Sequence, residues 1–220
     1  TVKIGFLNPQ PKTNLGTNVP IITTIALIVI AYLVGSIMTA YLVCKALKIQ
    51  PPTSQGSGNP GATNVLRMAG KKAALVTFLG DAIKGMIPVG AGHLLHASDT
   101  ILCLIALGAI IGHIYPIFFK FKGGKGVATS FGTILAISPT LGLLTLGTWL
   151  VTAIIFRYSS LAALVSLVSL PIWGVWQLKP PAFGVLILIT AGVLWRHRSN
   201  IKRLIDKKEP KIGQKKNGPQ

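Results

Sequence analysis

Apolar residues along this chain are gathered into seven runs separated by short polar segments. The runs cover approximately residues 20–43, 72–96, 99–119, 126–138, 140–156, 160–177 and 181–195. A helix needs about 20 apolar residues to cross the hydrocarbon core of a bilayer. The pattern therefore predicts an all-α integral membrane protein with about seven transmembrane helices, of which the one after residue 126 is short or tilted. We expect a polar tail over 1–19, a membrane domain over 20–205 and a basic tail over 206–220.

The charges between the runs predict how the chain is oriented. The sequence has 22 Lys and Arg against four Asp and Glu, a net charge of +18. Most of the basic residues follow the first, third, fifth and seventh runs, whereas the opposite side has only Lys3, Lys12 and Lys179. Because basic loops stay in the cytoplasm, we expect the N-terminus outside and the C-terminus inside. Four separate segments would then meet at the cytoplasmic face.

Two of these four segments are glycine-rich loops. The first is Gly-Ser-Gly-Asn-Pro-Gly-Ala-Thr-Asn at 56–64, followed by Arg67, and the second is Gly-Gly-Lys-Gly at 123–126. Glycines let the backbone approach an anion closely, and successive N–H groups form a nest for it. Arg67 and Lys125 are expected to lie in these loops, where they would add charge-assisted hydrogen bonds. The loops are typical of phosphate binding, although either one alone could be only a turn.

The other two segments contain polar residues that are open to two interpretations. Ser160 lies where a helix N-cap is expected, so its hydroxyl would serve either the helix or a ligand. His197 and Asn200 are three residues apart and would share one face of a helix, either in a site or in a basic tail against lipid headgroups.

Ionisable residues within the apolar runs are the remaining candidates. Asp81 and Lys84 would form either a structural ion pair or part of a site, because charges inside a span are costly. His113 lies near the end of a run, whereas His93 and His96 are expected to be structural.

Composition excludes several classes of function. Aromatic residues are few and the apolar runs dominate, so we expect no nucleic-acid partner. Four acidic residues cannot supply an Asp-rich magnesium site, and we expect no metal and no cofactor. No Ser-His-Asp catalytic set can be assembled either. A transporter of an anionic solute remains an alternative, because broken helices with glycine loops also occur there. Against it, few charges lie near the midplane and no inverted repeat is visible.

Together the four segments resemble the bacterial membrane acyl-phosphate:glycerol-3-phosphate acyltransferases over roughly residues 22–213. The first motif spans 56–67, the second Gly112 to Thr129 and the third 157–161, and the last runs from His197 through Glu209 to Lys211. Asp81 to Gly85 also fits the family pattern. Lys207 departs from it, since a glycine usually precedes the terminal glutamate.

The resemblance implies an enzyme that transfers an acyl group from acyl phosphate to the 1-hydroxyl of sn-glycerol 3-phosphate. The products would be lysophosphatidic acid and phosphate, in the first acylation of bacterial phospholipid synthesis. It further implies a site on the cytoplasmic face of the inner membrane, contact with membrane lipids and functional coupling to an enzyme that forms acyl phosphate. The implied catalytic residues are Ser57, Arg67, Lys125, Ser160, His197 and Asn200. The implied substrate-binding residues are Gly56, Gly58, Asn59, Gly61, Thr63, Asn64, Asp81, Lys84, His113, Gly123, Gly124, Gly126 and Arg203.

The residue that deprotonates the glycerol hydroxyl is left open by the sequence. His197 is one candidate base, and the phosphate of the donor is the other. We favour the phosphate, because the sequence places no carboxylate to orient His197 and the neighbouring Arg196 and Arg198 disfavour a protonated imidazole.

Overall fold

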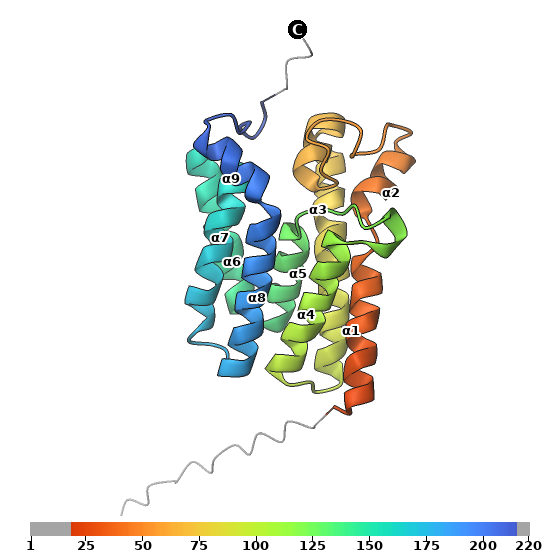
Figure 1. The fold of residues 1–220 in the computed structure, drawn as a ribbon, viewed down its shortest axis with the longest axis vertical. Coiled ribbons are helices and arrows are strands. Elements are labelled where there is room, and N and C mark those ends of the chain that lie inside the picture. The colour runs from red at the N-terminus through yellow and green to blue at the C-terminus, as the bar shows by residue number, and fades with distance from the viewer. Residues whose placement is uncertain (1–18, 215–220) are drawn as a thin grey trace, which may run out of the picture.

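The computed structural model describes residues 19–214, in which all regular structure is helical. The polar tail expected over 1–19 therefore lies almost entirely outside the described residues. The helices are α1 (Ile21–Gly35), α2 (Thr39–Ala46), α3 (Ala62–Leu94), α4 (Asp99–Ile114), η1 (Ile117–Phe119), α5 (Val127–Ile137), α6 (Pro139–Phe156), α7 (Ser159–Gly174), α8 (Pro180–Arg196) and α9 (Arg198–Ile205). In Figure 1 the long helices lie side by side along the longest axis, and α2 and α9 lie at the same end.

The outer surface of the bundle is apolar. Side chains such as Leu143, Ile154 and Leu188 are at least 60% exposed, a costly arrangement in water and a favourable one in lipid. By length and composition, four of the described segments can cross a membrane, or up to five if α8 and α9 form one bent span. Helices α5 and α7 are shorter. The all-helical membrane architecture is confirmed, whereas the number of crossings and the orientation stay predictions.

Helix α5 is short and lies inside the bundle. It packs against α3, α4 and α6, and most of its side chains are buried. Gly132 allows this helix to approach the backbone of Ala82 in α3, and Gly112 of α4 similarly faces the carbonyl of Tyr32 in α1. Small residues at such contacts are typical of helix packing in membranes. The expectation of a short helix after the second glycine loop is confirmed.

The first apolar run is broken between α1 and α2, and a buried ion pair supports the break. Lys84 Nζ donates a 2.6 Å hydrogen bond to the carbonyl of Ile37 and lies 2.8 Å from Oδ1 of Asp81. A break in a membrane helix leaves backbone groups without intrahelical partners, and these must be satisfied within the protein. Lys84 meets that need, and Asp81 balances its charge.

Two local expectations were wrong. Arg67 does not lie in a loop, because α3 begins at Ala62 and continues through a kink at Gly70, where φ is 81°. Ser160 is not an N-cap, because α7 begins at Ser159 after Tyr158.

Lys207, where the family pattern has glycine, adopts a left-handed φ of 54°. This turn is one that glycine would form without strain.

Candidate active site

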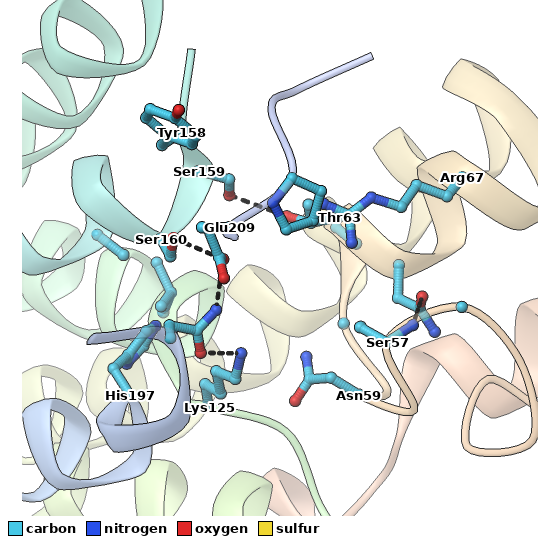
Figure 2. A pocket seen from close by; sticks show the side chains of 18 of the residues that line it. Ser57, Asn59, Thr63, Arg67, Lys125, Tyr158, Ser159, Ser160, His197 and Glu209 are labelled. Atoms are coloured by element: carbon cyan, nitrogen blue, oxygen red, sulfur yellow. Dashed lines mark hydrogen bonds between the residues drawn. The ribbon is translucent and has the colours of Figure 1, made fainter. Parts of the chain in front are cut away.

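A single cavity of about 1400 Å³ is lined by residues from all four basic segments. Figure 2 shows Ser57, Asn59, Thr63 and Arg67 on one side of it, facing Lys125, His197 and Glu209 on the other. The prediction that these four segments meet at one end of the bundle is therefore confirmed.

Most of the residues predicted from the sequence line this cavity. Those that do are Gly56, Ser57, Asn59, Gly61, Thr63, Asn64, Arg67, Asp81, His113, Lys125, Gly126, Ser160, His197, Asn200 and Arg203. Gly58, Lys84, Gly123 and Gly124 do not. The roles of all of these residues stay predictions.

The first glycine loop is held by the side chain of Asn64, which is buried in the first turns of α3. Its Oδ1 accepts a 2.8 Å hydrogen bond from the backbone N–H of Ser57, and its Nδ2 donates to the carbonyls of Pro52 and Gln55 at 2.8 and 3.1 Å. Gly56 has a φ of 64°, and a Cβ at this position would collide with Oδ1 of Asn64. The amide of Asn64 is thus occupied by the loop itself, and it fixes Ser57 at the edge of the cavity.

The second glycine loop is held by hydrogen bonds to His113 and Arg196. The backbone N–H of Gly124 donates to the carbonyl of His113 at 3.1 Å, and a Cβ on Gly124 would collide with the His113 ring. The guanidinium of Arg196 donates to the carbonyls of Gly123 and Gly124 at 3.2 to 3.3 Å. These contacts turn Lys125 toward the cavity. The sequence interpretation assigned no such role to Arg196.

Behind the clamped loop, His113 lies close to the buried ion pair of α3. Its Nδ1 is 3.7 Å from Oδ1 of Asp81, which also contacts Lys84. Asp81 and His113 reach the cavity, whereas Lys84 faces the helix break. Both interpretations of this pair hold in part. Lys84 supports the fold at the helix break, and Asp81 lines the cavity.

Glu209 lines the cavity, but the sequence interpretation left it out of the site. Its Oε1 accepts hydrogen bonds of 2.7 Å from Ser160 Oγ and from Asn200 Nδ2, and its Oε2 accepts one of 2.6 Å from Arg203 Nε. The side chain is 7% exposed. Burial alone would raise the pKa of Glu209, but these three hydrogen bonds and the charge of Arg203 outweigh it and hold the pKa below its usual value. Glu209 is therefore ionised at neutral pH.

Asn200 connects Glu209 to Lys125. Because its amide N–H group points to the carboxylate, its Oδ1 is left to accept a hydrogen bond from Nζ of Lys125. Burial is the main cause that lowers the pKa of Lys125 to about 8, and the charges of Arg203, Arg196 and Arg67 lower it further, while Glu209 opposes them. Lys125 is thus a cation whose charge can be lost just above neutral pH.

His197 lies between α8 and α9 and is 2% exposed. Its Nδ1 is 2.8 Å from the carbonyl of Val193. Since a carbonyl only accepts, Nδ1 must carry the proton, and Nε2 of the neutral ring is then an acceptor. No carboxylate hydrogen-bonds to His197 among residues 19–214 of the structure.

A cluster of three aromatic side chains also lines the cavity. These are Phe78, Phe131 and Trp149, with centroid separations of 6.4 Å between the two phenylalanines and 6.3 Å between Phe131 and Trp149. Cationic and hydrogen-bonding side chains line the same cavity. The cavity therefore suits a molecule, or a pair of molecules, with anionic groups joined to an apolar chain.

Comparison with known proteins gives a consistent result. The sequence model of a family described as glycerol-3-phosphate acyltransferase matches residues 25–207. A glycerol-3-phosphate acyltransferase of Vibrio cholerae serotype O1 is 47% identical over 195 residues, which cover 89% of this chain and 93% of the relative. One from Paraburkholderia phytofirmans is 48% identical over 195 residues, with coverages of 86% and 90%.

Solved structures agree with the sequences. The fold is similar to crystal structures of PlsY (YgiH), an integral membrane glycerol 3-phosphate acyltransferase. The glycerol 3-phosphate form has a TM-score of 0.83 and 38% identity, over 87% of this chain and 96% of the other. The lysophosphatidic acid form has a TM-score of 0.81, with the same identity and coverage. From the family match and these relatives, the chain belongs to the glycerol-3-phosphate acyltransferase family of enzymes and is a multi-pass membrane protein.

Proposed function

We propose that this protein transfers a fatty acyl group from acyl phosphate to the 1-hydroxyl of sn-glycerol 3-phosphate. The products are lysophosphatidic acid and inorganic phosphate, and the reaction is the first acylation of bacterial phospholipid synthesis. The observation that carries the proposal is one cavity lined both by cationic side chains and by a cluster of aromatic side chains. Both substrates have a phosphate, and the donor also has an acyl chain, so the two kinds of lining match what must be bound together.

The chemistry requires little covalent help from the protein. Acyl phosphate is a mixed anhydride, so phosphate leaves readily once the glycerol oxygen attacks the carbonyl carbon. Arg67, Lys125 and Arg203 offset the repulsion between two anions, and bringing the reactants together lowers the entropic barrier. Cations and N–H donors stabilise the negative charge that develops on the carbonyl oxygen and on the departing phosphate.

We propose that the phosphate of the donor takes the proton of the attacking hydroxyl. The new ester bond forms, the bond between carbonyl carbon and phosphate oxygen breaks, and the proton leaves with the phosphate. In this scheme Nε2 of His197 accepts a hydrogen bond from the hydroxyl and holds it in place. His197 as general base is the alternative, and the absence of a carboxylate bonded to its ring in the described chain favours the first account.

The proposed topology follows the charge distribution. Seven crossings put the N-terminus outside and the cavity on the cytoplasmic face of the bacterial inner membrane, where glycerol 3-phosphate is available. The acyl phosphate would come from an enzyme that forms this unstable anhydride, so we expect functional coupling to such an enzyme.

Purified protein in lipid nanodiscs tests the reaction directly. We expect labelled glycerol 3-phosphate to be converted to lysophosphatidic acid with acyl phosphate, and not with acyl-coenzyme A or acyl carrier protein supplied alone. Equal rates with acyl-coenzyme A would contradict the assignment of the donor. Flux of glycerol 3-phosphate across liposomes without acyl transfer would favour a transporter instead.

A further inference from the structure

Helix α9 has two faces, and only one of them belongs to the cavity. The helix follows a bend of 58° from α8 and lies at the edge of the bundle in Figure 1. Asn200 and Arg203 face the cavity. Arg198, Ile201, Lys202 and Ile205 follow at spacings of three, four and seven residues, so they share a second helical face. We call this set, with Trp195 at the end of α8, the outer α9 face.

The outer α9 face is exposed although it is partly apolar. Ile205 is 74% exposed, Trp195 is 65% exposed and Ile201 is 37% exposed. The guanidinium of Arg198 lies 5.2 Å from the ring centroid of Trp195. An apolar stripe of this kind is unfavourable in water, and the cations beside it are unfavourable in hydrocarbon. The boundary between acyl chains and headgroups satisfies both requirements, and tryptophan is enriched there.

The charge of this surface favours anionic headgroups. Arg198 and Lys202 are exposed on this face, and Asp206 is the exposed acid that follows the helix in the described part of the chain. Polar and apolar residues are strongly segregated in this short helix, whereas the exposed side chains of the long helices, such as Leu143, Ile154 and Leu188, are mostly apolar.

We propose that the outer α9 face binds anionic phospholipid headgroups at the membrane surface. By holding α9, the lipid also holds Asn200 and Arg203 in the cavity, so membrane charge sets how well the substrate phosphates are bound. The effect on catalysis rests on the proposed acyltransferase reaction, whereas the binding of lipid does not.

The test compares nanodiscs of phosphatidylcholine with nanodiscs that also contain phosphatidylglycerol. Hydrogen exchange of the amides of residues 198–205 is expected to slow severalfold in the anionic discs. Inorganic phosphate added to the neutral discs should not reproduce this protection. In the same discs we expect the KM for glycerol 3-phosphate to fall severalfold. The double variant Arg198→Gln/Lys202→Gln should show the same exchange and the same KM in both lipids, and Ile205→Ser should weaken both effects.

A matched control removes equal charge elsewhere. Lys71 and Lys72 are exposed on α3, away from the outer α9 face, and the Lys71→Gln/Lys72→Gln variant should keep the full lipid response. Equal exchange of α9 in the two lipids, protection by free phosphate, or an equal loss of response in the control variant would overturn the proposal. Absence of acyl transfer with intact protection of α9 would instead count against the proposed function alone.

Discussion

The hydroxyl of Ser160 donates a 2.7 Å hydrogen bond to Oε1 of Glu209, although 49 residues separate the two along the chain. The same oxygen accepts from Asn200, and the other carboxylate oxygen accepts from Arg203. One buried carboxylate thereby orders three side chains from two helices. Through Asn200 it also fixes the position of Lys125.

We predict that Glu209→Gln lowers both activity and stability. The new amide keeps one acceptor but places an N–H donor against the other donors, and a mismatched buried group costs roughly 1–3 kcal/mol. If the same cost is lost from transition-state binding, the rate falls about 5- to 150-fold, and we also expect a lower melting temperature. Asp206→Asn is the matched control, because Asp206 is an exposed acid three residues away. If the two variants have the same kcat and Tm, the role given to Glu209 is wrong.

The pKa of Lys125 predicts how activity depends on pH. With a pKa lowered to about 8, Lys125 is protonated below that pH and loses its charge as the pH rises through it. If the cation is needed for turnover, kcat/KM should fall on the alkaline side of about pH 8. Lys125→Arg keeps the charge at all accessible pH values and should abolish this limb even if its rate is reduced.

Arg67→Ala provides the control for this pH effect. Loss of a charge-assisted contact costs roughly 1.5–3 kcal/mol, so the rate should fall about 10- to 100-fold. The alkaline limb should nevertheless persist, because Lys125 is still present. A limb that survives in Lys125→Arg would show that another group titrates.

The sequence was sufficient to predict the helical architecture and most of the cavity. The apolar runs, the two glycine loops and the one-sided charge distribution each follow from local composition, and together they predict that four segments meet. The short helix α5 could also be predicted, because its apolar run is too short to cross a bilayer unaided.

Interactions that depend on distant partners could not be predicted in the same way. Glu209 lies in a highly charged tail, where an acid is ordinarily solvated, and only folding brings it against Ser160 and Arg203. Ser160 looks like a helix cap until Glu209 is known to accept from it. The start of α3 could not be predicted either, because the helix begins at Ala62 within the glycine motif.

We predict that Lys84→Met destabilises the protein. The variant leaves Asp81 as an uncompensated buried charge and the carbonyl of Ile37 without its hydrogen bond. Removing one partner of a buried pair costs about 3–5 kcal/mol, which thermal unfolding in detergent would detect. In the double variant Asp81→Asn/Lys84→Met the loss should be smaller than the sum of the single losses. Additive losses would show that the two residues do not stabilise the fold as a pair.

We predict that activity does not require a divalent metal. Within residues 19–214 no cluster of three or more His, Cys, Asp or Glu side chains is placed to hold one, and cations of the protein face the cavity. Protein treated with excess EDTA should keep its full rate. A complete loss that magnesium restores would contradict this prediction.

The last prediction separates the two accounts of proton transfer. His197→Asn and His197→Gln keep a hydrogen-bonding side chain but cannot act as a base near neutral pH. If the donor phosphate is the base, at least one of them should retain measurable activity, well above that of His197→Ala. Its pH profile should also lack any limb that histidine would cause.

General-base catalysis by His197 predicts the opposite pattern. Both polar variants would then be as inactive as His197→Ala, and the profile of the wild type would show a limb from histidine titration. Neither amide reproduces both ring nitrogens, and Nδ1 is held by the carbonyl of Val193, so the unfolding temperature of each variant must be measured as well. Asn200→Ala supplies the remaining comparison, because Asn200 lies one turn further along and bonds to Lys125 and Glu209 instead. If Asn200 only positions phosphate through Lys125, Asn200→Ala should raise the KM of the substrates. Loss of the contact between His197 and the hydroxyl should instead lower kcat.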